Sequence, residues 1–454
     1  MLEESSKGRL LNRKWAVWAL AGAVTVTTAA VGGTLGAATA AAKTTLTLAT
    51  YGDQTKDMAV WKQVKAAFEK QYPQYELKVQ ISTYIDYIGK VTTQMAAGQP
   101  PDVLQTWAQY KPVWTTKGIL LDLTSRVKNS KIASLDDFPP AIRDTTEYNG
   151  KIWGVPFDFG SMLWFANVDL LEEAGLPRPS DQWTVNDFAE LARKVTRPDK
   201  GIWGTINPVG WAGLPNLQWT YNFTGHYWLT NDGKDVAVDD AGTIAMHKFW
   251  YDLVYQDKAA PPPNLSLAEG RNEWAGYVGV WGSWLSSFGH FSQIMNARQA
   301  AHQQMYRWTV LPIPAGPKAQ NDFAQGHMWS IPAGVRRPDD AWKLVEWLGS
   351  REAEEIFVRN NFIQPMRQEE QLWNEWLSAN FLPANQANQL KAWIIGVLYG
   401  KGIAKNFNYW PTYNEMASNA MNEALYNIFT GHKAIENELA TAAAKMRVIL
   451  AKQK

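Results

Sequence analysis

The stretch from Gly150 to Glu173 constrains the fold of this chain more than any other part of its sequence. It reads GKIWGVPFDFGSMLWFANVDLLEE, which predicts a short strand at 151–156, a loop at 157–161 and a second strand at 162–168. Glycine and proline limit where such a backbone can bend. The loop holds one carboxylate, Asp158, between two phenylalanines. We interpret the stretch as a crossover between two halves of the protein, with Asp158 as a candidate ligand contact.

Length, charge and cysteine content exclude several classes of protein. A chain of 454 residues is too long for one compact core and predicts two or three domains. The formal net charge of +1 gives no electrostatic basis for binding nucleic acid or an acidic membrane surface. Because the chain has no cysteine, it cannot form disulfides, thiolate metal sites, a cysteine nucleophile or a lipid-modified cysteine after a leader.

Motifs for metal, nucleotide or acyl-transfer chemistry are also missing. The six histidines show no metal-ligand spacing, and no phosphate-binding glycine loop or Gly-x-Ser-x-Gly turn occurs. We therefore predict no metal and no cofactor. A pair of catalytic carboxylates cannot be recognised among 43 acidic residues. A secreted glycoside hydrolase consequently remains an alternative to a binding protein.

The N-terminus has the features of an export signal. Arg9, Arg13 and Lys14 precede an uncharged run at 15–42 that is rich in Ala, Val and Gly and ends in small residues. This predicts a signal peptide at 1–42, cleaved after residue 40 or 42. The alternative is an uncleaved anchor, since the run reaches the roughly 20 residues that span a bilayer. Both readings predict an extracytoplasmic protein in the periplasm or at the outer face of the cell membrane.

The chain before the crossover alternates strands with helices. The apolar spacing predicts strands at 44–51, 76–82 and 102–107 and helices at 57–72 and 84–97. This order is typical of a largely parallel sheet with helices on its faces. Ligands of open sheets lie beyond the carboxyl ends of the strands. We therefore expect four residues at a ligand-binding edge: Asp53, Gln54, Thr106 and Trp107.

After the crossover, glycine, proline and aromatic residues dominate. We predict a loop with short helical turns at 203–228, a strand at 277–281, and a turn at Gly282 and Ser283 that presents Trp284. Later strands are expected at 307–312 and 327–332. Helices are expected at 185–195, 241–257, 339–349 and 414–430 and at the C-terminus.

The 24 tryptophans are an unusual number and suggest a sugar ligand. The C–H face of a sugar lies flat on an aromatic ring, and its hydroxyls bond to carboxylates, amides and indole N–H groups. Trp61, Trp342 and Trp347 follow helical spacing and are predicted to be core. Trp211 and Trp284 lie in glycine-flanked segments and are predicted ligand contacts. Two further polar candidates, Asp158 and His327, could equally bond to neighbouring protein groups.

Several motifs, in this order, carry a family resemblance. They are Gly52-Asp-Gln, Ala97-Gly-Gln-Pro-Pro-Asp-Val, Tyr148-Asn-Gly-Lys-Ile-Trp-Gly-Val-Pro, Phe165-Ala-Asn-Val-Asp-Leu-Leu-Glu-Glu-Ala-Gly-Leu, Gly279-Val-Trp-Gly-Ser-Trp and Trp329-Ser-Ile-Pro-Ala-Gly. Together they resemble the extracellular solute-binding proteins of sugar ABC importers, family 1, in the maltose-binding-protein-like group. Each motif alone is weak, but six in the family's order are specific, and they cover nearly the whole chain after the leader.

The resemblance implies an α/β fold of the two-lobed periplasmic-binding type (type II), with a ligand cleft and hinge crossovers between the lobes. The first lobe would contain 43–155 and 313–365, and the second 156–312 and 366–454. By position, the candidates before the crossover fall where the family's first lobe meets sugar, and Trp284 falls where the second lobe stacks on it. The family's C-terminal aromatic is missing near Ser418, and Trp410 could replace it.

These observations predict a binding protein rather than an enzyme. A carbohydrate, in our interpretation an oligosaccharide, would bind between the lobes of a monomer, and the closed form would dock on the transmembrane subunits of an ABC permease. The missing cysteine leaves open how the protein is held at the membrane. Besides the hydrolase, a surface lectin that binds sugar without lobe closure is a further alternative.

We predict that Trp284→Ala and Trp211→Ala each weaken sugar binding well over tenfold without unfolding the protein, because each change removes a stacking surface. Calorimetric titration measures the affinity, and circular dichroism checks that the variants fold. Titration curves that match the unmodified protein would contradict the assignment.

Overall fold

The computed structural model describes residues 42–55, 57–210, 212–263, 276–284, 306–367, 369–379, 404–406 and 409–452. The chain divides into a unit of residues 1–42 and a unit of residues 43–454, and all elements below belong to the second. The predicted leader, apart from residue 42, lies outside the described residues.

The first part of the chain folds as its periodicity predicts. Strand β1 (Thr44–Tyr51) pairs in parallel with β2 (Tyr75–Ser82) and β3 (Val103–Thr106). Helices α1 (Met58–Gln71) and α2 (Tyr84–Ala96) connect them. The buried face of α1 consists of Val60, Trp61, Val64 and Phe68, which recur at helical spacing. The three parallel strands confirm the predicted sheet for this part of the chain.

One long strand replaces the predicted strand, loop and strand at 151–168. Strand β6 (Val155–Asn167) runs through Phe157, Gly160 and Ser161 without a break, so the predicted loop at 157–161 is wrong. Lys151–Ile152 (β5) instead form a small hairpin with β4 (Glu147–Tyr148). Pairing with neighbouring strands outweighs the local preference of Gly and Pro for turns, because strand propensity depends strongly on context.

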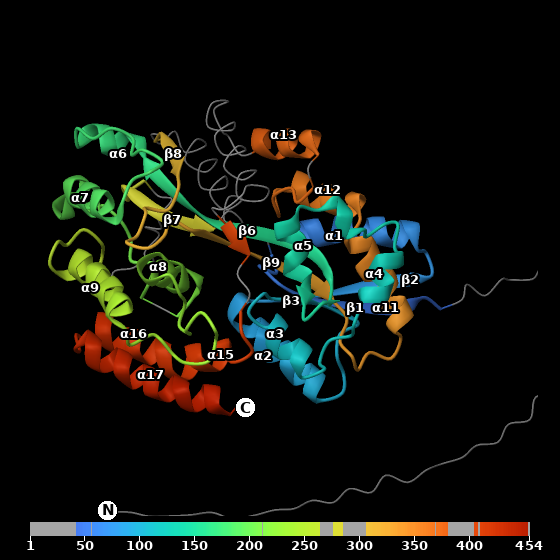
Figure 1. The fold of residues 1–454 in the computed structure, drawn as a ribbon. Coiled ribbons are helices and arrows are strands. Elements are labelled where there is room, and N and C mark those ends of the chain that lie inside the picture. Colours follow the sequence, from blue (N-terminus) through green and yellow to red (C-terminus); the bar gives the residue numbers. More distant parts are fainter. Residues whose placement is uncertain are drawn as a thin grey trace, which may run out of the picture. The chain divides into compact units, whose positions relative to one another are not determined.

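Strand β6 belongs to two sheets. Its residues 155–161 pair antiparallel with β9 (Asp322–Ser330), which itself pairs with β3 and, in parallel, with β10 (Ala404–Asn406). Its residues 162–167 pair antiparallel with β7 (Val280–Trp284) and β8 (Trp308–Leu311). Figure 1 shows β6 running from the strands β1 to β3 toward β7 and β8. The expectation of a largely parallel sheet is therefore wrong beyond β3, whereas the predicted crossover is confirmed.

Two predictions after the crossover are corrected by the structure. Residues 214–224 form helix α8 (Leu214–Thr224), not a loop. Pro215 lies in its first turn, where no backbone N–H is needed, and Gly225 ends it with a left-handed φ of 83°. Strand β7 continues through Gly282 to Trp284, because these residues pair with β6, so no turn lies at Gly282 and Ser283.

Helix α7 (Val185–Val195) illustrates a helix start that was predicted correctly. The hydroxyl of Thr184 accepts a hydrogen bond from the N–H of Asp187, and the Asp187 carboxylate accepts one from the N–H of Thr184. This capping box satisfies two N–H groups that the helix leaves unpaired. The predicted helix at 241–257 is observed as α9 (Ala241–Tyr255).

The remaining elements complete both parts of the fold. Short elements before and after β6 are α3 (Lys111–Thr116), α4 (Thr124–Asn129), η1 (Leu135–Asp137), α5 (Pro140–Thr146), α6 (Val168–Glu173) and η2 (Pro198–Lys200). Helices α11 (Pro338–Leu348), α12 (Arg351–Arg359) and α13 (Glu370–Ala379) follow β9. The C-terminal part contains α15 (Tyr413–Met416), a π-helical turn (Ala417–Met421), α16 (Asn422–Phe429) and α17 (Ile435–Ala451).

None of the helices in the described part of the chain is long and apolar enough to cross a membrane.

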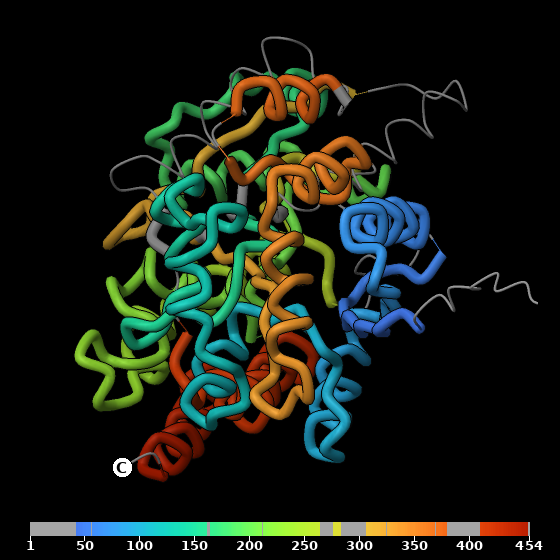
Figure 2. Tube along the Cα trace, turned by 90° about the vertical axis from the view of Figure 1, so that its right-hand side faces the viewer, coloured from blue at the N-terminus to red at the C-terminus, as the bar shows by residue number. Residues whose placement is uncertain are grey.

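Hydrophobic residues pack in two large clusters, and the first extends from the first lobe (β1, β2, β3 and β9 with their helices) onto one face of β6, β7 and β8 through Phe165, Trp281 and Trp308. In the first lobe, α1, α11 and α12 pack against the sheet of β1, β2, β3 and β9, and Trp61, Trp342 and Trp347 are buried there as predicted. In the second lobe, α7, α8, α9 and the C-terminal helices pack on one face of β6, β7 and β8. Figures 1 and 2 both show segments that are distant in sequence side by side, such as α1 with α12.

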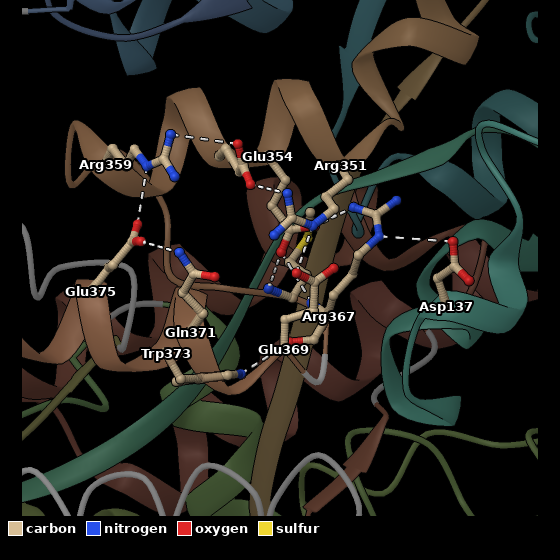
Figure 3. Close-up of polar contacts among 11 residues, drawn as sticks. Asp137, Arg351, Glu354, Arg359, Arg367, Glu369, Gln371, Trp373 and Glu375 are labelled. Atoms are coloured by element: carbon tan, nitrogen blue, oxygen red, sulfur yellow. Dashed lines mark hydrogen bonds and ion pairs between the residues drawn. The ribbon is translucent and has the colours of Figure 1, made fainter.

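A buried ion pair fixes the chain between α12 and α13 (Figure 3). Arg367 is bonded to the Glu354 carboxylate, and their side chains are only 5% and 1% exposed. Glu354 Oε1 also accepts hydrogen bonds from the backbone N–H groups of Met366 (2.7 Å) and Arg367 (3.0 Å). The Arg367 guanidinium donates to Gly349 O and lies 4.3 Å from the centre of the Phe138 ring. Both charges are therefore compensated where water is excluded.

We predict that Arg367→Met lowers the free energy of unfolding by about 3–5 kcal/mol, because Glu354 is left buried without its counter-charge. Adding Glu354→Gln, which keeps a backbone acceptor, should recover part of that loss. Urea unfolding followed by circular dichroism of the two single variants and the double variant measures the coupling. Strictly additive effects would contradict the pairing.

Candidate functional site

A cavity of about 360 Å³ lies where the two lobes meet. Its lining comes from β1, α2, the loop after β3, β6, the start of α8, β9 and the segment around α15. The lining residues are Tyr51, Tyr84, Gln109, Asp158, Gly160, Gly213, Leu214, Gln325, His327, Tyr409 and Tyr413. Tyrosines, amides and one carboxylate thus converge from segments that are far apart in the sequence. The volume is within the range of roughly 300–1,000 Å³ that is typical of small-molecule sites.

Asp158 and His327 form a hydrogen-bonded pair in the wall of the cavity. Asp158 Oδ1 accepts from the His327 backbone N–H at 2.9 Å and from ring Nδ1 at 2.7 Å, and Oδ2 is 2.9 Å from the same Nδ1. Because an ionised carboxylate only accepts, Nδ1 must carry the hydrogen. In the neutral ring, Nε2 is then an acceptor. A ligand can therefore bond to the carboxylate oxygens of Asp158 and to one ring nitrogen of His327.

An irregularity in β6 brings these two residues together. Pro156 pairs with Met328, but the next pair along the strands is Asp158 with His327, so Phe157 is an extra residue. Such a bulge bends a strand and redirects the side chains that follow it. Gly326 allows the close approach, since a Cβ there would lie 2.6 Å from the carbonyl oxygen of Asp158.

The tyrosines of the cavity are uncharged hydrogen-bonding groups. Burial, and then the negative charge of Asp158, raise the pKa of Tyr51 above its usual range. Burial likewise raises the pKa of Tyr409 and Tyr413. The Tyr409 hydroxyl donates to Gln325 Oε1 at 2.8 Å. The Tyr413 hydroxyl donates to Ala212 O at 2.8 Å, so the phenol oxygens of Tyr409 and Tyr413 can still accept hydrogen bonds from a polar ligand.

Aromatic stacking holds the cavity wall in the first lobe. The rings of Tyr84 and Trp107 are 4.6 Å apart at an angle of 13°, and Trp107 also stacks with Tyr87 at 5.5 Å and 20°. Tyr51 packs its edge against Trp107 at 5.2 Å. Trp107 is buried and lies behind Tyr84, which is 57% exposed. The cluster rigidly positions Tyr84 at the cavity.

A direct hydrogen bond joins the two lobes beside the cavity. Asn414 Nδ2, at the start of α15, donates to the backbone oxygen of Gln109 at 2.8 Å. Ala108, in the same loop of the first lobe, packs against the hydrophobic cluster of the second.

Within the described lining there is no lysine or arginine. The described residues contain no group of histidines and carboxylates that could hold a metal ion.

The residues predicted in the first lobe divide into two pairs. Asp53 and Gln54 are exposed in the turn after β1. There, Asp53 Oδ1 accepts from the N–H of Thr55, and Gln54 Nε2 donates to Ile81 O. Thr106 is buried, and its hydroxyl donates to Ser330 Oγ at 2.9 Å; Trp107 is the buried ring described above. None of the four belongs to the described lining, whereas the predicted Asp158 and His327 both do.

The three other tryptophans predicted as ligand contacts, Trp211, Trp284 and Trp410, have different positions. Trp211 lies outside the described residues. The backbone of Trp284 ends β7 opposite Met162, and its side chain is outside the description. Trp410 is half-buried against Trp228 and Tyr413, with its ring nitrogen 3.2 Å from Met416 Sδ.

All four tyrosines of the cavity were missed in the sequence, although one signal was available. Tyr51 is the last residue of β1, and Tyr84 lies two residues beyond the end of β2. The rule that ligands lie beyond the carboxyl ends of strands therefore points to both residues. After β1, the sequence prediction instead named Asp53 and Gln54, which follow Tyr51 in the turn. Tyr409, Tyr413 and Gln109 carry no comparable local signal, because only the approach of the lobes brings them to the cavity.

Comparison with known sequences supports the resemblance stated above. The family model of the bacterial extracellular solute-binding proteins matches residues 51–355. An uncharacterised lipoprotein of Streptomyces antibioticus is 22% identical over 299 residues. That alignment covers 65% of this chain and 64% of the relative, so the chain spans just under two thirds of that protein.

Solved structures show the same fold. An ABC substrate-binding protein of Listeria monocytogenes in complex with cycloalternan is 19% identical, with a TM-score of 0.77 over 90% of this chain and 99% of that one. An ABC transporter solute-binding protein of Agrobacterium radiobacter in complex with ribitol is 21% identical, with a TM-score of 0.74 over 90% and 99%. The predicted two-lobed, type II periplasmic-binding fold is thereby confirmed.

We predict that Trp107→Ala lowers the free energy of unfolding by about 3–5 kcal/mol, because it removes a buried ring from a packed cluster. Trp107→Phe, which keeps a ring and removes a buried N–H group, should cost less than about half of that. Urea unfolding followed by circular dichroism measures both. If Trp107→Ala unfolds at the same urea concentration as the unmodified protein, the supporting role is wrong.

Proposed function

Because the chain belongs to the family of bacterial extracellular solute-binding proteins, we propose that it binds a carbohydrate between its two lobes and delivers it to the permease of an ABC importer. The cavity is the observation that carries this proposal, since both lobes contribute tyrosines and amides to it. Sugars need ring faces for their C–H groups and neutral donors and acceptors for their hydroxyls. The related structures with cycloalternan and ribitol support the same ligand class.

The composition of the cavity favours binding over hydrolysis. Glycoside hydrolases use a pair of carboxyl groups on either side of the scissile bond. Asp158 is the one carboxylate in the described lining, and it is bonded to His327. We therefore propose a binding protein without catalytic activity.

The proposed mechanism is capture of the sugar by closure of the lobes. Micromolar affinity requires about 8 kcal/mol, whereas one aromatic contact contributes roughly 0.5–1.5 kcal/mol beyond its buried area. Contacts from both lobes are therefore needed, and they favour the closed form. In this proposal the lobes contain 43–155 with 313–365 and 156–312 with 366–454. The crossover strand β6 acts as a hinge, and a monomer docks on the permease.

The place of action follows from the family, which is extracellular. We propose that residues 1–42 direct export, either as a cleaved signal peptide or as an anchor. The proposal includes no lipid-modified cysteine, since the sequence contains no cysteine. The protein would thus reach the outer side of the cell membrane without the lipid anchor of lipoproteins.

We predict that a cognate sugar raises the melting temperature in a concentration-dependent way, since a ligand at a hundredfold its Kd adds about 2.7 kcal/mol of stability. A thermal-shift screen over mono- and oligosaccharides and polyols, with an equal concentration of an unrelated osmolyte as control, measures this. Small-angle scattering should then show a smaller radius of gyration with the sugar. Binding with an unchanged radius would favour the lectin alternative.

A further inference from the structure

The first residue of β9, Asp322, is a buried carboxyl group with one oxygen left without a partner. Its side chain is 0% exposed. Oδ1 accepts a hydrogen bond from Gln218 Nε2 of α8 at 2.9 Å, and the backbone N–H of Ile313 also bonds to the carboxyl group. No donor among the described residues reaches Oδ2. An ionised carboxylate would therefore be buried with one oxygen unsatisfied, which is costly.

The partner residue, Gln218, has an unsatisfied oxygen of its own. It is also 0% exposed, and in the described part of the chain no donor reaches its Oε1. The backbone oxygen of Asn321, which can only accept, lies 3.5 Å from Gln218 Nε2 and supports this orientation of the amide. One acid oxygen and one amide oxygen thus lack a hydrogen, on two side chains that already share a hydrogen bond.

We propose that Asp322 carries a proton in the native protein and that its Oδ2–H group donates to Gln218 Oε1. The two side chains then form a ring of two hydrogen bonds, which we call the acid–amide pair. The proton is taken up from solvent when the chain folds. This inference goes beyond the proposed function, because it concerns the native protein with or without a ligand. It makes the attachment of β9 to α8 depend on one proton.

The surroundings of Asp322 favour the uncharged acid. Burial raises the pKa of Asp322 well above its usual range, and the hydrogen bonds from Ile313 and Gln218 lower it by less. In β10 the residue opposite Asp322 is Ala404, which is uncharged. No cation of the described residues pairs with Asp322. A proton is therefore the simplest means of removing the charge.

The other ionisable groups around the start of β9 bond or pack elsewhere. On the α8 side, the phenols of Tyr221 and Tyr227 pack against the ring of Phe323 at 5.8 and 5.3 Å. The remaining ionisable residues on the elements that pack here are Asp158 of β6, which is bonded to His327; Lys405 of β10, whose side chain lies outside the description; and Arg143, which pairs with Asp136, and Asp144 of α5.

The acid–amide pair lies where β9 leaves the second lobe. The preceding residue, Asn321, exchanges two hydrogen bonds with Asn222 of α8: its N–H donates to Oδ1 at 2.7 Å, and its oxygen accepts from Nδ2 at 3.0 Å. From Ala324 onward β9 pairs with β6, and Gln325 and His327 line the cavity. The pair therefore fastens to the second lobe one end of a strand whose following residues form the cavity wall.

A protonated Asp322 determines how stability changes with pH. An unfolded aspartate loses its proton near about pH 4. Above that pH the native state holds one proton more than the unfolded state, so the folding equilibrium constant falls by up to about tenfold for each pH unit. The fall continues until the native protein itself releases the proton. Asp322→Asn can form the same ring without a bound proton, because its amide N–H replaces the acid O–H.

Urea unfolding of the full-length, ligand-free protein between about pH 5 and 8, followed by circular dichroism, measures this dependence. Relative to Asp322→Asn, the folding equilibrium constant of the unmodified protein should fall by close to tenfold per pH unit at the acidic end. Asp322→Asn should be the more stable protein at neutral pH. Asp199→Asn is the control: Asp199 is exposed in η2, so this variant should keep the slope of the unmodified protein.

Two results of this measurement would overturn the proposal. One is an equal slope for the unmodified protein and Asp322→Asn, which would mean that folding takes up no proton at Asp322. The other is failure of Asp322→Asn to fold at neutral pH, because an amide of the same shape should replace an uncharged acid without loss.

Exchanging the acid and the amide tests whether the two side chains share the proton. Gln218→Glu combined with Asp322→Asn places the acid on α8 and the amide on β9 and keeps the length of both side chains. This double variant should regain the pH dependence that Asp322→Asn alone has lost, because the pair again needs one proton. A flat profile of the double variant would contradict the acid–amide pair.

Infrared spectroscopy observes the proton itself. The C=O stretch of an un-ionised carboxyl group is separate from the bands of carboxylates and amides. The difference spectrum between the unmodified protein and Asp322→Asn at neutral pH should contain this band. A carboxylate band in its place would overturn the proposal, since Asp322 would then be ionised and compensated by a buried water or a bound cation. None of these measurements uses a sugar, so their outcome is independent of the proposed function.

Discussion

The pairing of one strand with two sheets is the constraint on which this structure depends. Strand β6 bonds to β9 over residues 155–161 and to β7 and β8 over residues 162–167. Successive side chains of a strand point to opposite faces. Phe157, Phe159 and Phe165 therefore enter the first hydrophobic cluster. Asp158 and Gly160 line the cavity, and further along the strand Trp164 and Ala166 enter the core of the second lobe. A single run of residues thus contributes to both hydrophobic clusters and to the cavity.

The same strand explains why a carboxylate can lie in the cavity wall. A buried carboxylate is costly unless hydrogen bonds compensate its charge. The bulge at Phe157 supplies that compensation, because it places Asp158 opposite both the backbone N–H and the ring of His327. Without the extra residue, Phe157 would occupy this position. The register of β6 against β9 therefore determines the position of the pair and also the chemistry that a ligand meets.

Sequence reasoning predicted the parts of the fold that depend on local patterns. Helices α1 and α7 follow from apolar spacing, and the crossover follows from the order of the segments. It failed where pairing between distant segments decides the outcome: Gly160 and Gly282 suggested turns but lie in paired strands. For the cavity, Asp158 and His327 were predicted, whereas Tyr409 and Tyr413 lie there only because α15 approaches the loop after β3. Such an approach leaves no local trace in the sequence.

The tryptophans show why composition alone gives an incomplete picture of the site. Trp61, Trp164 and Trp219 are fully buried, and their ring N–H groups have no hydrogen-bond partner among the described residues. An unpaired buried N–H costs roughly 1–3 kcal/mol. Burying the 150–250 Å² of an indole contributes about 4–6 kcal/mol at about 25 cal/mol per Å². Packing therefore outweighs the unsatisfied N–H, so a high tryptophan content is explained largely by the cores. The rings that line the cavity are instead tyrosines, and Trp107 stacks on one of them, Tyr84.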